Sequence, residues 1–273
     1  MSENLNNEIR SLKMQIAKLK LESKLRRNLA SELDKQKQIA KNAEELANEK
    51  SKEIEEIASQ LSKYLSPQLY DSIFSGEKKV SIESEKKFLT VFFSDIISFT
   101  EISDKMDSSP LTEMLNLYLT KMSEIALSFG GTIDKYIGDS VMIFFGDPES
   151  EGKEKAAINC VKMAIEMQNT MKTLSKKFMK DFNLPYPLNM RIGINSGECT
   201  VGNFGSEKRL DYTVIGGAVN LASRLESNSP AGKILISDVT ERLIKGAINC
   251  QQFDQIKAKG INEPINTFIP YFK

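Results

Sequence analysis

The 273-residue sequence predicts an α+β domain preceded by a long helix that forms a coiled coil. Residues 1–60 contain no glycine, proline or aromatic residue, a composition that favours one continuous helix. From residue 88 onward, short apolar and β-branched runs alternate with longer segments of helical period. This order of strands and helices indicates a layer sandwich in which helices cover one sheet.

Composition excludes several classes of protein. Lysine plus arginine and aspartate plus glutamate both number 37, so zero net charge disfavours bulk nucleic-acid binding. The three cysteines (Cys160, Cys199 and Cys250) form no CxxC pair and the chain has no histidine, which disfavours zinc or haem. No apolar run approaches the roughly 20 residues of a membrane span, and the polar N-terminus is not a signal peptide. We therefore expect a soluble cytoplasmic protein with reduced thiols, or the soluble portion of a larger receptor.

The N-terminal segment carries a narrow apolar seam with heptad-like steps of three and four. The seam breaks around residues 21–37, where Leu25, Leu29 and Leu33 are spaced by four, and such a break changes the local supercoil. A helix that is polar outside one narrow seam needs a partner, most simply a second copy in parallel. The alternatives are a single solvated helix and a disordered leader. The seam residues are Leu5, Ile9, Leu12, Ile16 and Leu19, and then Ala40, Ala43, Ala47, Lys50, Ile54, Ile57, Leu61 and Tyr64.

A junction separates this helix from the globular part. Ser66 precedes Pro67, a pattern typical of a capped helix start, and Gly76 would end that short helix. Residues 77–87 are charged and are interpreted as a linker. The expected organisation is a coiled-coil helix over 1–65, a junction and linker over 66–87, and a catalytic domain over 88–273.

The periodicities of the globular part predict the remaining elements. A buried strand at 88–94 leads into a helix that ends near Met106, and Leu111–Phe129 forms a second helix. The expected elements that follow are a hairpin over 132–145, a long amphipathic helix over about 152–180, strands 188–195 and 198–204 about a Ser196-Gly197 turn, a helix 217–227, a strand 233–237, a helix 238–245, and strands 253–259 and 267–272.

Two carboxylates stand at the ends of predicted strands. Asp95 ends the first strand, and Asp139 follows Gly138 at the tip of the hairpin. Taken singly, an aspartate after a strand is commonly a helix N-cap, and Gly-Asp is commonly a turn. A pair of carboxylates on neighbouring strand ends instead suits one or two Mg²⁺ ions that also hold substrate phosphates.

The flanks of these two residues carry a family resemblance. The segments Phe-Phe-Ser-Asp-Ile-x-x-Phe-Thr, around Asp95, and Asp-Lys-Tyr-Ile-Gly-Asp, ending at Asp139, resemble the catalytic domain of class III nucleotide cyclases. The resemblance extends over about Glu85–Lys273 and implies the ferredoxin-like core of that family. It also implies a segment between the helix and the domain that transmits a signal.

The resemblance implies a role for each matching residue. Asp95, Asp139 and the carbonyl of Ile96 match the ligands of two Mg²⁺ or Mn²⁺ ions per active site. Lys135 and Thr213 match the base-reading positions. The remaining matches are Asn220 for ribose orientation, Arg224 for the transition state, and Arg191 and Lys257 for the phosphates. Gly217 departs from the family pattern, in which an acidic or polar residue often follows Ile-Gly.

The base-reading pair favours ATP. Adenine presents an acceptor at N1 and a donor at N6, which a lysine and a threonine hydroxyl can meet. Guanine reverses both, so a guanylyl cyclase would need an acceptor in place of Lys135. The expected activity is formation of 3′,5′-cyclic AMP and pyrophosphate by a homodimer whose site lies between the two catalytic domains. The alternatives are a guanylyl cyclase and a catalytically silent regulatory protein of the same fold, and an upstream sensor is a possible partner.

Overall fold

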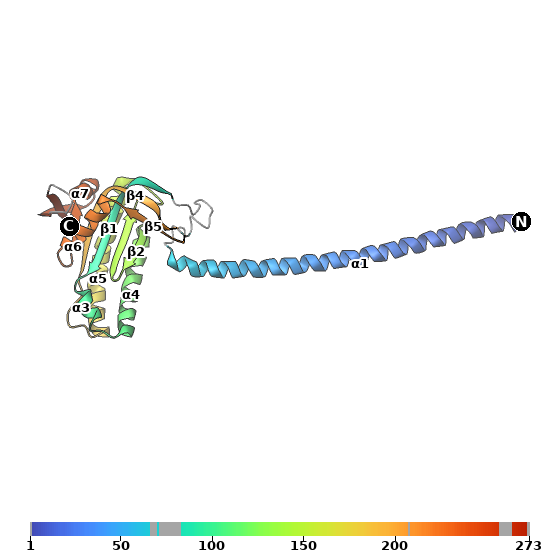
Figure 1. Ribbon diagram of the computed structural model, residues 1–273, viewed down its shortest axis with the longest axis horizontal. Coiled ribbons are helices and arrows are strands. Elements are labelled where there is room, and N and C mark those ends of the chain that lie inside the picture. The colour runs from blue at the N-terminus through green and yellow to red at the C-terminus, as the bar shows by residue number, and fades with distance from the viewer. Residues whose placement is uncertain (1, 66–69, 71–82, 207, 257–263, 272–273) are drawn as a thin grey trace. The chain divides into compact units, whose positions relative to one another are not determined.

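The computed structural model describes residues 2–65, 70, 83–206, 208–256 and 264–271 (Figure 1). The chain divides into two units, Met1–Tyr64 and Leu65–Lys273, which are treated separately below. The predicted short helix after Ser66 falls largely outside the described residues, as does Lys257.

The first unit is a single helix. Helix α1 (Ser2–Leu61) runs for 60 residues and ends in a 3₁₀ turn, η1 (Ser62–Tyr64), which confirms the predicted continuous helix. Its large apolar side chains from Ile9 onward are solvent-exposed, for example Leu19 at 64% and Ile54 at 63%. Among the helices in the described part of the chain, none combines the length and the apolar character required to cross a bilayer.

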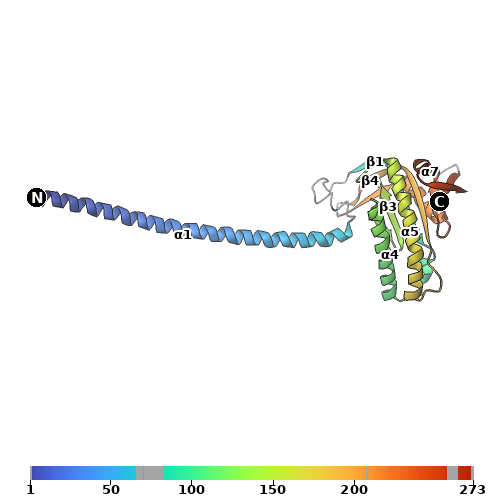
Figure 2. The same ribbon diagram turned by 180° about the vertical axis from the view of Figure 1, so that it is seen from behind.

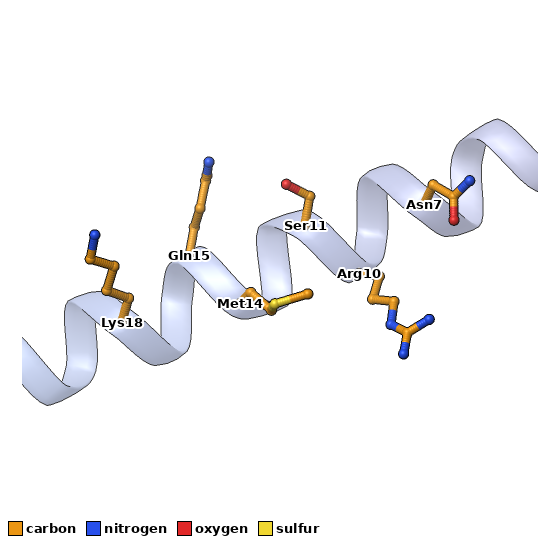
Figure 3. Close-up of a pocket in the computed structure, with 6 residues that line it drawn as sticks. All are labelled: Asn7, Arg10, Ser11, Met14, Gln15 and Lys18. Atoms are coloured by element: carbon orange, nitrogen blue, oxygen red, sulfur yellow. The ribbon is translucent and has the colours of Figure 1, made fainter.

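A shallow hollow on α1 is not a binding site. Figure 3 shows that all of its lining side chains come from one helix, with Ser11, Gln15 and Lys18 projecting to one side and Arg10 to the other. Because one helix provides all of this lining, the hollow is the surface between successive turns of α1.

The second unit is built on a mixed sheet. Its strands follow the order β2-β3-β1-β4-β6-β8-β7, and β5 pairs with β4 off this path. Strands β4 and β6 pair in parallel, whereas the other pairs are antiparallel. The strands are β1 (Ser84–Ile96), β2 (Thr132–Ile137), β3 (Ser140–Phe145), β4 (Met190–Ser206), β5 (Arg209–Ile215), β6 (Ile234–Ser237), β7 (Asn249–Ile256) and β8 (Ile265–Tyr271).

Helices lie on both faces of this sheet. The larger core joins Phe92 and Ile192 of the sheet to Tyr118 of α4 and Met167 of α5, and Figure 2 shows these two helices side by side over the strands. The opposite face packs Val91 and its neighbours against α6. The helices are α3 (Phe99–Ser103), α4 (Ser108–Ser128), α5 (Lys153–Asp181), α6 (Gly217–Asn228) and α7 (Asp238–Ile244).

The prediction of two strands about a Ser196-Gly197 turn is wrong, because β4 is one continuous strand. The expected turn at Ser196-Gly197 does not exist, because β1 pairs with β4 without interruption from Ser84↔Gly202 to Ile96↔Met190. Gly197 serves close packing instead: a Cβ there would lie 2.9 Å from the Cβ of Ala218 on α6. A glycine required by a neighbouring helix therefore resembled a turn signal in the sequence.

Two strand boundaries and one whole strand also differ from expectation. Strand β1 begins at Ser84, inside the predicted linker, because Lys87 pairs with the buried Asp147 at 2.5 Å and its neighbours pair with β4. Strand β7 begins at Asn249, four residues before the expected 253, and its polar Asn and Gln residues are mostly exposed. Strand β5, which contains Thr213, was not predicted as a strand.

Candidate active site

Asp95 lies near the exit of β1, on the sheet face that packs against α6. It stands directly opposite Arg191 in the β1–β4 pairing, and Arg191 Nη2 donates to Asp95 Oδ2 at 2.8 Å. The N-cap of the next helix is Ser98, so capping α3 is not the role of Asp95. The carboxylate of Asp95 therefore contacts Arg191 on the adjacent strand β4.

Asp139 approaches the same place from the β2–β3 hairpin. Gly138 adopts φ 65°, a conformation that glycine enters without steric penalty, and the two-residue turn brings Asp139 toward the end of β1. There the backbone N–H of Ile96 donates to Asp139 Oδ2 at 2.8 Å. Burial, together with the adjoining Asp95 carboxyl, raises the pKa of Asp139 to about 7, although the Ile96 N–H opposes this rise. The two predicted metal-site carboxylates are therefore neighbours.

Glu226 completes this cluster and was missed from the sequence. Arg191 Nε lies 2.5 Å from Glu226 Oε1, so the guanidinium joins a carboxylate of β1 to one of α6. Burial raises the pKa of Glu226, and the charge of Arg191 opposes that rise. Helix α6 reaches this position because Gly193 has no side chain: a Cβ there would lie 2.0 Å from the backbone nitrogen of Glu226. A buried glutamate at the end of a helix motif gave no signal that separates it from a surface residue.

Lys135 and Thr213 form a second cluster between β2 and β5. Lys135 Nζ lies 3.3 Å from Thr213 Oγ1, although the two residues are 78 positions apart. A register shift between the pairs Ile133↔Ile143 and Lys135↔Met142 leaves one extra residue in β2. The extra residue, Asp134, accepts a 2.6 Å hydrogen bond from Thr213 Oγ1 and was also missed from the sequence.

The remaining predicted residues are Asn220 and Arg224 on α6, and Lys257, which lies outside the described residues. Asn220 is exposed, and Arg224, one turn further along α6, is half-buried. Their spacing of four places them on one face of the helix, as predicted. The structure therefore brings Asp95, Ile96, Asp139 and Arg191 together in one cluster and pairs Lys135 with Thr213 in another.

The family model for the adenylate and guanylate cyclase catalytic domain matches residues 82–270. The chain belongs to this family. The match covers the sheet except the last residue of β8, and it includes both clusters described above. It confirms the class III resemblance that rested on the segments around Asp95 and Asp139. Enzymes of this family use divalent metal ions, bind a nucleotide substrate and typically act as dimers.

Solved structures support the same assignment. The adenylyl cyclase CyaB from P. aeruginosa is 51% identical, with a TM-score of 0.68 over 70% of this chain and 97% of that one. The guanylyl cyclase Cya2 is 33% identical, with a TM-score of 0.65 over 68% of this chain and 93% of that one. These neighbours confirm the predicted cyclase fold, and they include enzymes named for either base.

A curated relative supports the same family assignment. The terminal-differentiation-specific adenylate cyclase of Dictyostelium discoideum is 34% identical over 224 residues, which is 80% of this chain and 10% of that protein. The chain spans 10% of this relative, 41% of the adenylate cyclase of Anabaena cylindrica and 20% of the rat retinal guanylyl cyclase 1.

Proposed function

We propose that this chain is an adenylate cyclase, which converts ATP to 3′,5′-cyclic AMP and pyrophosphate. The observation that carries the choice of base is the contact of Lys135 with Thr213, 3.3 Å between Nζ and Oγ1. The N1 and N6 atoms of adenine are neighbouring groups on one edge, so adjacent lysine and hydroxyl groups can meet both. The 51% identity to an adenylyl cyclase points the same way.

The carboxylate pair fits a divalent cation. The neighbouring Asp95 carboxyl disfavours ionisation of Asp139, and a cation between the two side chains would relieve that repulsion. Within the described residues, no group of three or more His, Cys, Asp or Glu side chains gathers as a metal cluster. Substrate phosphates and the Ile96 carbonyl would therefore supply the other oxygens that Mg²⁺ or Mn²⁺ requires. We propose two ions, which when bound would acidify the 3′-hydroxyl and neutralise the triphosphate.

Residues of the chain would position and stabilise the reacting groups. Asn220 would hold the ribose so that the 3′-oxygen attacks in line with the leaving pyrophosphate. Arg224 is a planar, permanently charged fork and suits the charge that grows on the phosphoryl oxygens. Arg191 already contacts Asp95 and Glu226 through Nη2 and Nε, so Nη1 would be the atom that meets a phosphate. Lys257 keeps its proposed phosphate role.

We propose that the site forms between two copies of the domain. The cluster of Asp95, Asp139 and Arg191 would come from one chain, and Lys135, Thr213, Asn220, Arg224 and Lys257 from the other. Ile137 and Ile215, which are 59% and 47% exposed, lie two residues from Lys135 and Thr213. Apolar side chains exposed beside the base-reading pair are typical of a surface that a partner covers.

Helix α1 would hold the two copies together. Its exposed seam gives each chain an apolar stripe that a second α1 can bury in a parallel coiled coil. Such a connection raises the effective concentration of the catalytic domains to about the millimolar range. The change of spacing at Leu25, Leu29 and Leu33 would then be a two-state element that an upstream sensor module biases. These assignments keep the proposed division into helix, junction and catalytic domain.

Two alternatives make different predictions. A guanylyl cyclase would need an acceptor where Lys135 stands, and wrongly paired groups in a buried site can reduce turnover by about 10⁴-fold. A catalytically silent protein would be expected to lack Asp95, Asp139, Asn220 or Arg224, and all four are present.

The deciding experiment measures cyclic AMP and cyclic GMP from purified protein given ATP or GTP in parallel, with Mg²⁺ or Mn²⁺. We expect cyclic AMP to be the preferred product. Preference for GTP would overturn the assignment of the base, and absence of both products at micromolar protein would favour the silent alternative.

A further inference from the structure

A buried carboxylate lies behind the base-reading pair. The side chain of Asp134 is 0% exposed, and it contacts both Thr213 and Lys135. The bulge in β2 makes this possible, because the extra residue in the strand lets consecutive side chains reach the same neighbour on β5. A carboxylate is rarely buried unless it is hydrogen-bonded or paired with a cation. The contacts with Thr213 and Lys135 therefore indicate the role of Asp134.

Both oxygens of Asp134 face donors. The backbone N–H of Val214 points at Oδ2 from 3.4 Å, and a backbone N–H can only donate. Lys135 Nζ lies 3.1 Å from Oδ1 as an ion pair, and an ammonium group can only donate. The 2.6 Å contact between Oδ2 and Thr213 Oγ1 is therefore a hydrogen bond in which the threonine hydroxyl is the donor and the carboxylate is the acceptor.

This arrangement leaves the pair with one donor and one acceptor for a base. The Thr213 hydroxyl donates its hydrogen bond to Asp134 and accepts one from Lys135, so one lone pair of its oxygen remains for a ligand. The Lys135 ammonium group donates one proton to Thr213 and lies beside Asp134 Oδ1 as an ion pair, without a hydrogen bond to that oxygen. Its remaining protons are donors for a ligand, and the Lys135 side chain is 40% exposed, so a ligand can reach them.

We propose that Asp134 is a specificity-determining positioning residue that fixes the hydroxyl proton of Thr213 and thereby converts an ambivalent hydroxyl into an acceptor. The remaining donor and acceptor match N1 and the 6-amino group of adenine. Against guanine, the Lys135 proton would meet N1–H and the Thr213 lone pair would meet O6, which is unfavourable at both positions. Lys135 alone disfavours guanine at N1–H. By fixing Thr213 as an acceptor, Asp134 also disfavours guanine at O6.

The inference rests on the proposed adenylate cyclase activity and deepens it. Its test compares kcat/KM for three nucleotides: ATP, GTP, and purine riboside triphosphate, which keeps N1 but lacks the 6-amino group. The variants are Asp134→Asn, Thr213→Val and, as the conservative control, Thr213→Ser. An asparagine cannot accept at both of the Asp134 oxygen positions, so its amide would place N–H toward either Thr213 or Lys135.

We expect the wild-type enzyme to prefer ATP to purine riboside triphosphate by about tenfold or more, the value of one hydrogen bond in a desolvated site. Thr213→Val and Asp134→Asn should both abolish this preference and reduce the ATP:GTP ratio of kcat/KM by about tenfold. Thr213→Ser should retain both. A merely structural role would instead lower turnover of all three nucleotides equally.

The outcomes separate the two proposals. A wild-type enzyme that prefers GTP would overturn both of them. If wild type prefers ATP and Asp134→Asn keeps its full preference while Thr213→Val loses it, only the role of Asp134 fails. Should Asp134→Asn not fold, 6-methoxypurine riboside triphosphate tests wild type directly. It places an acceptor at position 6, so it should react more slowly than purine riboside triphosphate, and faster reaction would show that Thr213 can still donate.

Discussion

The backbone N–H of Ile96 donates a 2.8 Å hydrogen bond to the carboxylate of Asp139, 43 residues away. This contact fastens the β2–β3 turn to the exit of β1, and it brings Asp139 beside Asp95. Two carboxyl groups so placed repel one another when both are ionised. We therefore expect a divalent cation bound between these carboxylates to stabilise the site.

The first prediction concerns pH and metal ions. Burial and Asp95 raise the pKa of Asp139 to about 7. In the metal-free protein, the contribution of Asp139 to the free energy of unfolding is therefore largest below the unfolded pKa near 4, and it is lost as the pH rises through 7. A divalent cation binds the ionised form. The increase in melting temperature on adding Mg²⁺ should therefore be larger at pH 8 than at pH 6, as measured by differential scanning fluorimetry.

Asp139→Asn is the matched control for that measurement, because it keeps the shape of the side chain and removes the titrating group. In this variant the Mg²⁺-induced change in melting temperature should be small at both pH values, and activity should be lost. An equal Mg²⁺ effect in wild type and variant would place the cation elsewhere.

The second prediction concerns the contact of α6 with the sheet. Gly193→Ala would place a Cβ 2.0 Å from the backbone nitrogen of Glu226 and 2.4 Å from the carbonyl of Ala222, and backbone atoms cannot move independently of the helix. We expect a loss of about 3 kcal/mol or more of unfolding free energy by urea denaturation. Activity should fall as well, because α6 carries Asn220 and Arg224.

Gly217→Ala provides the control on the same helix. Nothing lies within 4 Å of a Cβ at Gly217, which stands in the first turn of α6 and needs no positive φ. Alanine should leave activity intact and change stability by about 0 to +1 kcal/mol through helix propensity. A large loss in this variant would show that the unusual glycine after Ile-Gly is required.

Local signals in the sequence were sufficient for one part of the site and not for the other. The turn at Gly138 and the apolar run before Asp95 are read from neighbouring residues, so the carboxylate pair could be predicted. Glu226 and Asp134 act through contacts that depend on how α6 crosses Gly193 and on a one-residue bulge in β2. Hydrophobic period reports which face of an element is buried, and it carries no information on such registers between distant elements.

The third prediction tests the shared site. Asp95→Ala and Asn220→Ala homodimers should each be inactive, since every site would lack one group. Subunit exchange between them should restore about a quarter of wild-type activity, because half of the dimers are mixed and each mixed dimer has one intact site. Activity is measured as cyclic AMP formed after co-refolding or co-expression. Mixtures that remain inactive, with heterodimers demonstrated by differential tags, would contradict a site built from two chains.

The fourth prediction concerns the apolar seam of α1. Replacing Leu12 and Leu19 with aspartate puts charges in the proposed coiled-coil seam, whereas aspartates at Ser11 and Ala17 lie off it and serve as the control. In the seam variant we expect specific activity to fall on dilution below about micromolar concentration, because the catalytic domains then associate without the tether. The control and wild type should hold their activity over the same range. Sedimentation velocity on the same samples reports the dimer directly, and a seam variant that stays dimeric and fully active at every concentration would remove α1 from dimerisation.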